Sequence, residues 1–485
     1  MKVLKDIKVE KIEDVQWVVT VPAIWSNTAK NKMREAALRA GLIKRDIFNH
    51  LKIIVLNGPK KKKKKTECGS IAARRYCDLK KDDKYILLDL GGGTADIACH
   101  CMWDNMRVSQ IHAPSGGPWG STYIDEAFWG ILCEMFGREM MEEFKVKCPN
   151  SFIRLKEDFR LAKHNYKPTP SEPPIVEISS IIDFMDKRDI DIDTMVKKVK
   201  EYKLKDKSGI IELDEDIGSL CIGHEGWIYL MEQVVDPLIK HVHTLLMKRP
   251  LQGCQTMLCV GGLSTSHYVI QRLRDEFITK HKMIKTITKP EEPILAVMEG
   301  AVRFGMDPSS IVAYVMTYTY GLRCARVWAE YDGEDGKIWS EEDHMYIFEH
   351  GFEVFTRKND KMNVYDPPIV KYFQPLKKGN KEITVEIHRS DDEDPKRCTD
   401  ATVCARGTFE LPGDWWEGTG AEEKEIPIAF FFNRAEIQVK RLFWPPKLFA
   451  VIDTPNSNSL TENLPFPKKS KEDNNLDPKK KNNKI

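Results

Sequence analysis

Asp89, Thr94 and Asp96 supply the polar side chains of one short stretch, and three consecutive glycines, Gly91–Gly93, lie between them. Glycine lets the backbone adopt positive φ and approach a ligand without a Cβ in the way. Successive N–H groups exposed in such a turn form an anion-binding concavity. Asp89 can hold a magnesium ion through water or position an attacking water, and Thr94 can donate to a terminal phosphate. The stretch therefore predicts a phosphate-binding hairpin.

The elements on both sides of these glycines read as strands. An apolar run from Tyr85 to Leu88 predicts a buried strand, and Ile97 and Ala98 begin a second one. The pattern is not a Walker loop, because no Gly-Lys-Ser/Thr follows. It is not a dinucleotide fingerprint either, because the glycines are contiguous and lead into a strand. An ordinary glycine turn in a β-hairpin is the alternative interpretation of this stretch alone.

Two further glycine turns follow along the chain. The one at residues 115–125 opens an amphipathic helix through Phe128 and Met135, and a helix N-terminus behind glycines is a natural anion site. The other contains Gly261 and Gly262. It closes a buried strand and opens a helix through Ile270.

Composition sets the limits within which these turns must be interpreted. The 485 residues suggest about two to four domains, and the net charge of +2 gives no argument for nucleic-acid binding. No apolar run approaches the ~18 residues of a membrane helix. The 12 cysteines include no Cys-x-x-Cys pair, which favours reduced thiols in an intracellular protein.

The remaining pattern predicts further elements in order. Strands are expected at residues 14–23, 47–56 and 175–182, and helices at residues 28–40, 68–76, 152–166, 228–246 (interrupted near Pro237) and 294–302. The lysine run Lys60–Lys65 predicts an exposed insertion, with a nuclear-localisation signal as the alternative. Short β-type runs after residue 312 predict a small antiparallel sandwich. Residues 446–485 are expected to be a disordered basic tail.

Three glycine turns in this order resemble the actin, hexokinase and heat-shock ATPase superfamily. The stretch Asp89–Asp96 resembles the second phosphate loop of the seventy-kilodalton heat-shock chaperones, and Val260–Gly262 resembles their adenosine loop. Residues 22–25, 117–122 and 299–305 are similar to the divergent subfamily called heat shock 70 kDa protein 12. The resemblance covers residues 14–306 strongly and continues weakly to about residue 442.

The resemblance implies an α/β fold of the actin-like ATPase (ribonuclease H-like) type, with two nucleotide-binding lobes. The implied domains are a partial first lobe at 1–84, a second lobe at 85–310 with a return helix to the first lobe, a β-rich module resembling a substrate domain at 311–445, and the tail. The first lobe is expected to be incomplete, because residues 1–20 contain no counterpart of the family's Asp-x-Gly-Thr phosphate loop.

The resemblance also implies roles for individual residues. Asp89 and Thr94 match catalytic positions, and Asp89 also matches the carboxylate that holds magnesium through water. The matched nucleotide contacts are Gly91, Gly92, Gly93, Asp96, Gly120, Ser121, Lys163 (as an adenine-side lysine), Gly261 and Gly262. The cofactors are then ATP or ADP and magnesium, and the chemistry is positioning and charge neutralisation around phosphoryl transfer to water.

One departure weakens the expected hydrolysis. Asn57 or Gly58 stands near the place of the family's water-orienting glutamate, and a neutral side chain cannot act as a general base. Together with the unmatched first loop, this predicts weak ATP binding and little or no turnover. The expected function is an atypical heat-shock-type, chaperone-like protein of the stress response, cytoplasmic with access to the nucleus.

Two alternatives remain open at this point. One is a non-catalytic interaction scaffold, in which the glycine turns persist only as fold elements. The other is a sugar or acetate kinase of the same superfamily, for which no substrate-binding motif is found. Expected partners are protein clients or signalling proteins, with no nucleic acid and no membrane span.

Overall fold

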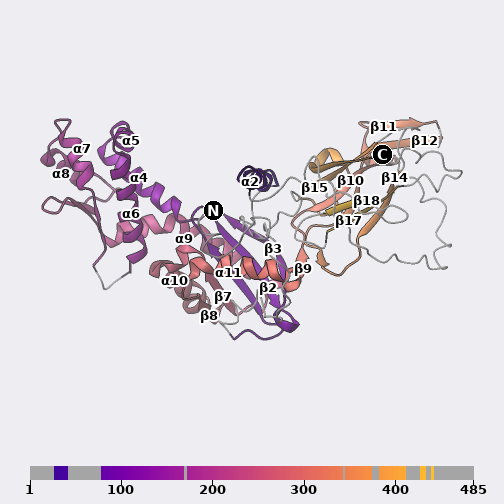
Figure 1. The fold of residues 1–485 in the computed structure, drawn as a ribbon, viewed down its shortest axis with the longest axis horizontal. Helices are drawn as coiled ribbons and strands as arrows, with labels where there is room; N and C mark the ends of the chain where they lie inside the picture. The colour runs from indigo at the N-terminus through magenta and orange to yellow at the C-terminus, as the bar shows by residue number, and fades with distance from the viewer. Residues whose placement is uncertain are drawn as a thin grey trace.

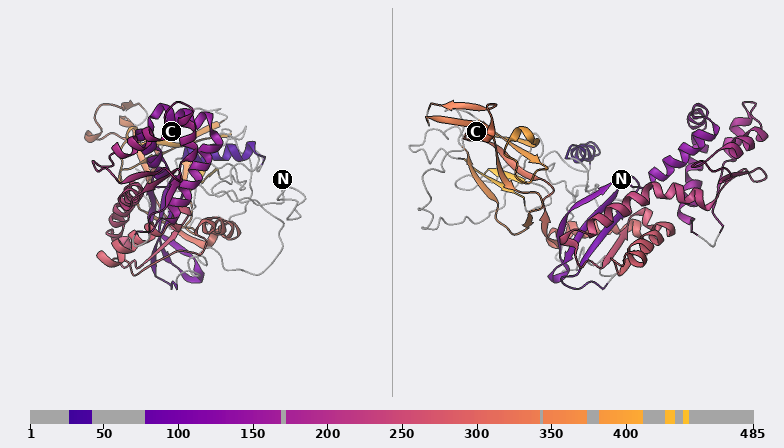
Figure 2. Two further views of the ribbon diagram at one scale, coloured as in Figure 1. Left: turned by 90° about the vertical axis from the view of Figure 1, so that its left-hand side faces the viewer. Right: turned by 180° about the vertical axis from the view of Figure 1, so that it is seen from behind.

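The computed structural model describes residues 27–41, 78–168, 172–341, 344–373, 382–410, 426–432 and 438–441. Within these residues the chain forms a mixed α/β architecture. Figure 1 shows a group of helices at one end of the long axis, a sheet in the middle and a β-rich group at the other end. The same arrangement is seen from behind in the right-hand view of Figure 2.

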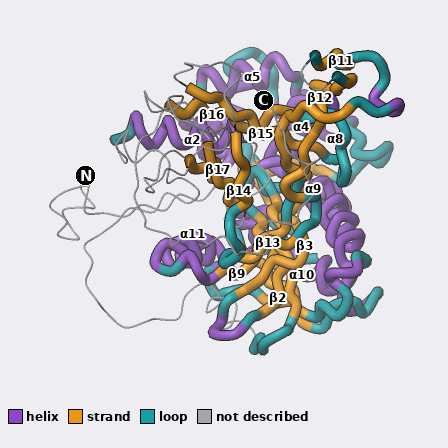
Figure 3. Tube along the Cα trace, turned by 90° about the vertical axis from the view of Figure 1, so that its right-hand side faces the viewer, coloured by secondary structure: helices purple, strands orange, loops and turns teal. Residues whose placement is uncertain are grey.

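The middle sheet carries the first glycine turn. Its seven strands are β1 Lys84–Leu90, β2 Ala95–Met102, β3 Val108–Gly117, β7 Thr256–Val260, β8 Thr286–Thr288, β9 Ile311–Val315 and β13 Lys361–Asn363. They lie in the order β13-β9-β3-β2-β1-β7-β8. β1, β2 and β3 form an antiparallel meander, whereas β7 runs parallel to β1. The predicted strands around Gly91–Gly93 are confirmed as β1 and β2, which are neighbours in the interior of this order. Figure 3 shows β2, β3, β9 and β13 of this sheet.

The two faces of the sheet pack against different helices. Alternate residues of β1 point to opposite faces, so Ile86 and Leu88 belong to a large core that they share with helices α4 Thr122–Phe136, α9 His224–Leu246 and α10 His267–Arg274. Tyr85 belongs to a smaller core on the other face, against which α11 Pro293–Met306 packs Ala296 and Val297. The outer side of α11 exposes an apolar stripe formed by Ile294, Met298, Val302 and Met306.

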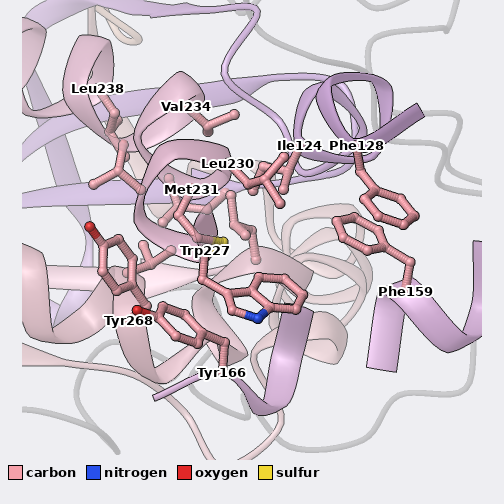
Figure 4. Close-up of a cluster of buried hydrophobic side chains, with 14 of the residues drawn as sticks. Ile124, Phe128, Phe159, Tyr166, Trp227, Leu230, Met231, Val234, Leu238 and Tyr268 are labelled. Atoms are coloured by element: carbon pink, nitrogen blue, oxygen red, sulfur yellow. The ribbon is translucent and has the colours of Figure 1, made fainter. Parts of the chain in front are cut away.

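The helical end of the molecule is tied to the middle by stacked aromatic rings. It contains α5 Arg138–Lys147, α6 Pro149–Asn165, α7 Ser179–Asp186, α8 Ile192–Glu201 and a small sheet of β4 Ile175–Glu177, β6 Ser219–Ile222 and β5 Ile211–Asp214. The Phe159 ring of α6 stacks on Phe128 of α4 with centroids 4.1 Å apart, and on Trp227 of α9 at 5.6 Å (Figure 4). These contacts fix α6 relative to α4 and α9.

The β-rich end contains two sheets. The larger has the order β11 Lys337–Ser340, β12 Met345–Thr356, β10 Thr319–Val327, β15 Glu382–Ser390 and β16 Thr402–Glu410, and the smaller has β14 Ile369–Phe373, β17 Ile426–Phe431 and β18 Gln438–Arg441. Their ladders are antiparallel. Val385 and Ile387 of the larger sheet share one buried cluster with Ile428 and Phe430 of the smaller sheet. β9 and β13 belong instead to the middle sheet.

Short turns complete the described elements. The 3-10 turns are Asp104–Met106, Arg249–Leu251, Gly262–Thr265, Pro308–Ser310, Glu330–Asp332 and Cys398–Asp400, and a π-helical turn, Asp275–Lys280, follows α10. Near the N-terminus, the predicted helix is confirmed as α2 Asn27–Arg39, and Gly41 beyond it has φ +68°. The predicted elements at 14–23, 47–56 and 68–76, the run Lys60–Lys65 and the tail 446–485 lie outside the described residues.

Two predictions for the helical end are wrong. Residues 175–182 form a strand only at Ile175–Glu177, and a helix begins at Ser179, because the buried residues Ile181, Phe184 and Met185 follow helical spacing. The helix α9 is not interrupted near Pro237, which lies inside it. A proline removes a single N–H donor, and the buried residues of α9 continue on both sides of it.

Candidate functional site

The first glycine turn joins β1 to β2 and presents free backbone donors. Within the turn, the N–H of Gly91 donates to the carbonyl of Thr94 at 3.0 Å. Gly92 and Gly93 are exposed, and in the described part of the chain their N–H groups donate to no carbonyl. The Thr94 hydroxyl donates to Oδ2 of Asp96 at 2.8 Å. The turn therefore exposes the backbone N–H groups of Gly92 and Gly93. They lie next to the ends of β1 and β2, which carry the carboxylates of Asp89 and Asp96.

The second glycine turn packs directly on the first. The N–H of Ser121 donates to the carbonyl of Gly91 at 3.1 Å, and the N–H of Thr122 donates to that of Gly92 at 2.9 Å. The Thr122 hydroxyl donates to the same Gly92 oxygen at 2.9 Å. A Cβ on Gly120 would stand 2.1 Å from this oxygen, so only glycine fits there. The contact between the two turns rests on this close approach.

The third glycine turn meets the start of the first. Asp89 of β1 is in register with Val260 of β7, and Gly261 follows immediately with φ +83°. A Cβ on Gly261 would lie 2.6 Å from Oδ1 of Asp89 and 2.5 Å from the carbonyl oxygen of Leu90. Gly262 has no such restriction, since its nearest contact would be Ile294 at 3.8 Å. All three turns thus lie at one place on the sheet.

Asp89 has the perturbed carboxyl group of this site. It lies directly opposite Asp96 in the β1–β2 ladder. Burial, together with the smaller effect of the negative charge of Asp96, raises the pKa of Asp89 to about 6. A bound cation would favour the ionised form of such a carboxylate. The Asp89 carboxylate can hold a magnesium ion that takes its remaining ligands from water and phosphate, and the free amides beside it suit the phosphate oxygens.

Lys163, predicted as an adenine-side contact, lies behind the second turn. Its side chain is 1% exposed and its ammonium forms an ion pair with Asp125. The same Nζ donates to the carbonyl oxygen of Ser121 at 3.1 Å. Burial lowers the pKa of Lys163, and Asp125 opposes this effect. In the structure, the described partners of Lys163 therefore belong to the second turn and the N-terminus of α4.

The next residue, His164, is a contact of the third turn that the sequence did not predict. Its Nδ1 lies 2.6 Å from Oγ1 of Thr265, and the Thr265 hydroxyl donates to the carbonyl of Gly262 at 2.7 Å. Because that hydroxyl proton is used, Nδ1–H of His164 must be the donor to Thr265. A hydroxyl residue three positions after Gly262 is the local signal for this contact, but its partner is 101 residues away.

The second turn has a further support, which the sequence did not predict. Trp119 occupies the space in which a Cβ on Gly117 would stand, 2.5 Å from Cε2 of the indole ring. The indole packs beside His241 of α9, with centroids 5.2 Å apart. His241 Nε2 lies 3.0 Å from Oγ of Ser115 on β3. The turn is therefore held from the α9 side as well as from α6.

Two negative findings apply to the described residues. None of their helices has the length and apolar character needed to cross a bilayer. No group of three or more His, Cys, Asp and Glu side chains among them is arranged as a metal site. Asn57 and Gly58, matched above to the water-orienting glutamate, lie outside the part that the structure describes.

A mixed α/β fold with glycine turns gathered at a central sheet fits the actin-like ATPase fold of the seventy-kilodalton heat-shock proteins. No family model matches the chain. Over 501 residues it is 24% identical to heat shock 70 kDa protein 12A of Mus musculus, and the alignment covers 93% of this chain and 71% of the mouse protein.

The human relatives give the same result. The chain is 24% identical to heat shock 70 kDa protein 12A of Homo sapiens over 503 residues, covering 93% of this chain and 71% of that protein. It is 24% identical to human heat shock 70 kDa protein 12B over 481 residues, covering 88% of this chain and 68% of that protein. The chain is therefore related to the heat shock 70 kDa protein 12 family.

Proposed function

We propose that the chain is an atypical heat-shock-type protein that binds ATP or ADP with magnesium in the three glycine turns. The observation that carries this proposal is steric. Gly120 is packed against the backbone of Gly92, and Gly261 is packed against the carboxylate of Asp89. Both contacts are so close that the Cβ of any other residue type would clash. A turn that serves only to reverse the chain does not need a second and a third turn closed upon it.

Each turn has a role in the proposed site. The free amides of Gly92 and Gly93 bind phosphate oxygens, since backbone N–H groups in a turn form an anion site. The Thr94 hydroxyl, which donates to Asp96 in the unliganded chain, turns to a phosphate oxygen when the nucleotide binds. Asp89 holds magnesium through water, and the ion supplies neutralisation of the phosphate charge. Gly120 and Ser121 close over the phosphates. Gly261 and Gly262 contact the adenosine end.

We expect little or no hydrolysis. In the described part of the site, the Asp96 carboxylate is engaged by the Thr94 hydroxyl. Asp89 is then the carboxylate that must position the attacking water, with Thr94 beside it. The same carboxylate must also hold the magnesium ion. The neutral Asn57 or Gly58 at the matched glutamate position supplies no general base. The proposed protein is a nucleotide-dependent, chaperone-like protein of the cytoplasm, with protein clients or signalling proteins as its partners.

The steric observation is tested by comparing Gly120→Ala with Gly130→Ala. A Cβ on Gly130 of α4 meets no atom within 4 Å, whereas a Cβ on Gly120 would meet Gly92 at 2.1 Å. We expect isothermal titration calorimetry to show that Gly120→Ala weakens magnesium-ADP binding at least about 30-fold, since two loop contacts are worth about 1 kcal/mol each or more. Gly130→Ala should bind like the wild type.

Equal affinities in both variants would overturn the proposal that the turns form the site. A folded wild-type chain that gives no binding heat would favour the non-catalytic scaffold instead. Circular dichroism spectra of both variants establish that the comparison is made on folded protein.

A further inference from the structure

Two adjacent residues near the C-terminal end of α6 each reach a different glycine turn. Lys163 contacts the second turn through the Ser121 carbonyl and Asp125. His164 contacts the third turn through the Thr265 hydroxyl. These turns are otherwise separated by about 140 residues of chain. Lys163 and His164 together are called the α6 pair below.

We propose that the α6 pair is a positioning device that fixes the separation of the second and third glycine turns. Its consequence for nucleotide affinity rests on the proposed function, in which the second turn closes over phosphate and the third contacts adenosine. Lys163 and His164 act through the turns in this account, not by contact with the ligand. Lys163 then has a different role from the adenine-side contact that the sequence predicted.

Burial and pairing of Lys163 support this role. The Lys163 side chain is 1% exposed, and its ammonium lies between a carboxylate and a carbonyl oxygen. A buried ammonium must keep such partners, because an unpaired charge in the interior is costly. Its contact with Ser121 is therefore fixed, and Ser121 in turn donates to the carbonyl of Gly91. Lys163 thus reaches the first turn through one intermediate residue.

The connection through His164 is equally direct. Thr265 donates to the Gly262 carbonyl and accepts from His164 Nδ1, so a single hydroxyl joins α6 to the backbone of the third turn. Gly261 of that turn lies on Asp89 and Leu90. The contacts form a closed ring: first turn to second turn, second turn to α6, α6 to third turn, and third turn back to the first.

The position of α6 itself is set by packing one turn earlier. Phe159 stacks between Phe128 and Trp227, with an interplanar angle of 1° to Phe128. Lys163 lies four residues after Phe159, on the same helix face. The stacked rings fix the position of α6 in the fold. The α6 pair in turn fixes the second and third glycine turns relative to α6.

Hydrogen exchange of the unliganded chain tests the coupling without any nucleotide. Thr265→Val removes the acceptor for His164 and should speed exchange about tenfold at residues 261–265, and also at the Ser121 and Thr122 amides of the second turn. Lys163→Met should accelerate exchange at the same two places. Lys156→Met, which removes an exposed ammonium from the same helix, should change neither. Exchange that rises only at the turn next to each substitution would overturn the proposal.

Ligand fragments separate positioning from direct contact. ADP spans both turns, whereas adenosine and inorganic tripolyphosphate each reach one side of the site. We expect Thr265→Val to weaken ADP binding about three- to tenfold, the equivalent of one hydrogen bond, and to change the affinity of each fragment less than about twofold. Thr265→Ser, which keeps the hydroxyl, should restore ADP affinity.

The outcomes distinguish this inference from the proposed function. A loss of adenosine affinity as large as that of ADP would mean that Thr265 contacts the nucleoside and would contradict the positioning role. If the wild-type chain binds none of the three ligands, the proposed function fails, and the exchange experiment alone decides whether the α6 pair couples the turns.

Discussion

Gly261 stands against the carboxylate of Asp89, so that a Cβ at position 261 would lie 2.6 Å from Oδ1. The strand that carries Asp89 and the strand that ends at Gly261 are parallel neighbours separated by more than 160 residues of chain. The acidic group of the site and the third glycine turn are therefore parts of one packed unit.

Substitution of Gly261 should cost more stability than substitution of a glycine with the same backbone angle in open space. Gly253 has φ +82° and no atom within 4 Å of a Cβ, whereas Gly261 has φ +83° and a close contact. We expect Gly253→Ala to cost about 1–2 kcal/mol from backbone strain alone. Gly261→Ala should cost an additional ~1–3 kcal/mol, measured by urea unfolding. Equal costs would show that the Asp89 contact relaxes freely.

Asp89→Asn should stabilise the protein near pH 7 while removing the carboxylate proposed to hold magnesium. Because the pKa of Asp89 is raised from 3.8 to about 6, the folded chain binds more protons than the unfolded chain between these values. Its stability contribution therefore falls as the pH rises from about 4 to about 6. The Asn variant should be about 1–3 kcal/mol more stable at pH 7 and unchanged at pH 4.

Urea unfolding of wild type and variant at the two pH values measures this difference. A stability difference that does not change with pH would contradict the raised pKa of Asp89. A variant less stable than the wild type at pH 7 would show instead that the ionised carboxylate has a stabilising partner.

Loss of the Lys163 ammonium should destabilise the fold because Asp125 is left behind. We expect Lys163→Met to lower the free energy of unfolding by about 2–4 kcal/mol, since breaking a buried pair leaves an uncompensated charge. The double variant Lys163→Met/Asp125→Asn should recover at least half of that loss. Purely additive losses in a double-mutant cycle would mean that the two groups do not interact in the folded chain.

Local patterns identified much of what surrounds the first turn. The apolar run before Gly91 and the alternation after it determine β1 and β2, since both depend on neighbouring residues. The same holds for α4, where glycines precede an amphipathic repeat. Ser179–Asp186 was missed because Ile178 and Ile182 fit alternation as well as they fit a helix, and tertiary burial of Phe184 decided between them.

The long-range contacts could not be read in the same way. Gly120 needs to be glycine because of Gly92, and Gly261 because of Asp89, and neither neighbour is close in sequence. His164 has no local feature that marks it as a partner of Thr265. Lys163 lies at helical spacing from the apolar residues of α6, which the sequence shows. Its burial against Asp125 depends on how Phe159 packs α6 onto the rest of the fold.

Isothermal titration of the wild-type 485-residue chain with ATP, in magnesium and again in excess EDTA, measures the proposed nucleotide site itself. We expect saturable binding of one nucleotide per chain in magnesium, weakened at least about tenfold in EDTA because the phosphate charge is no longer neutralised. Binding that is unaffected by EDTA would contradict the role of Asp89, and a flat titration of folded protein would contradict the nucleotide site itself.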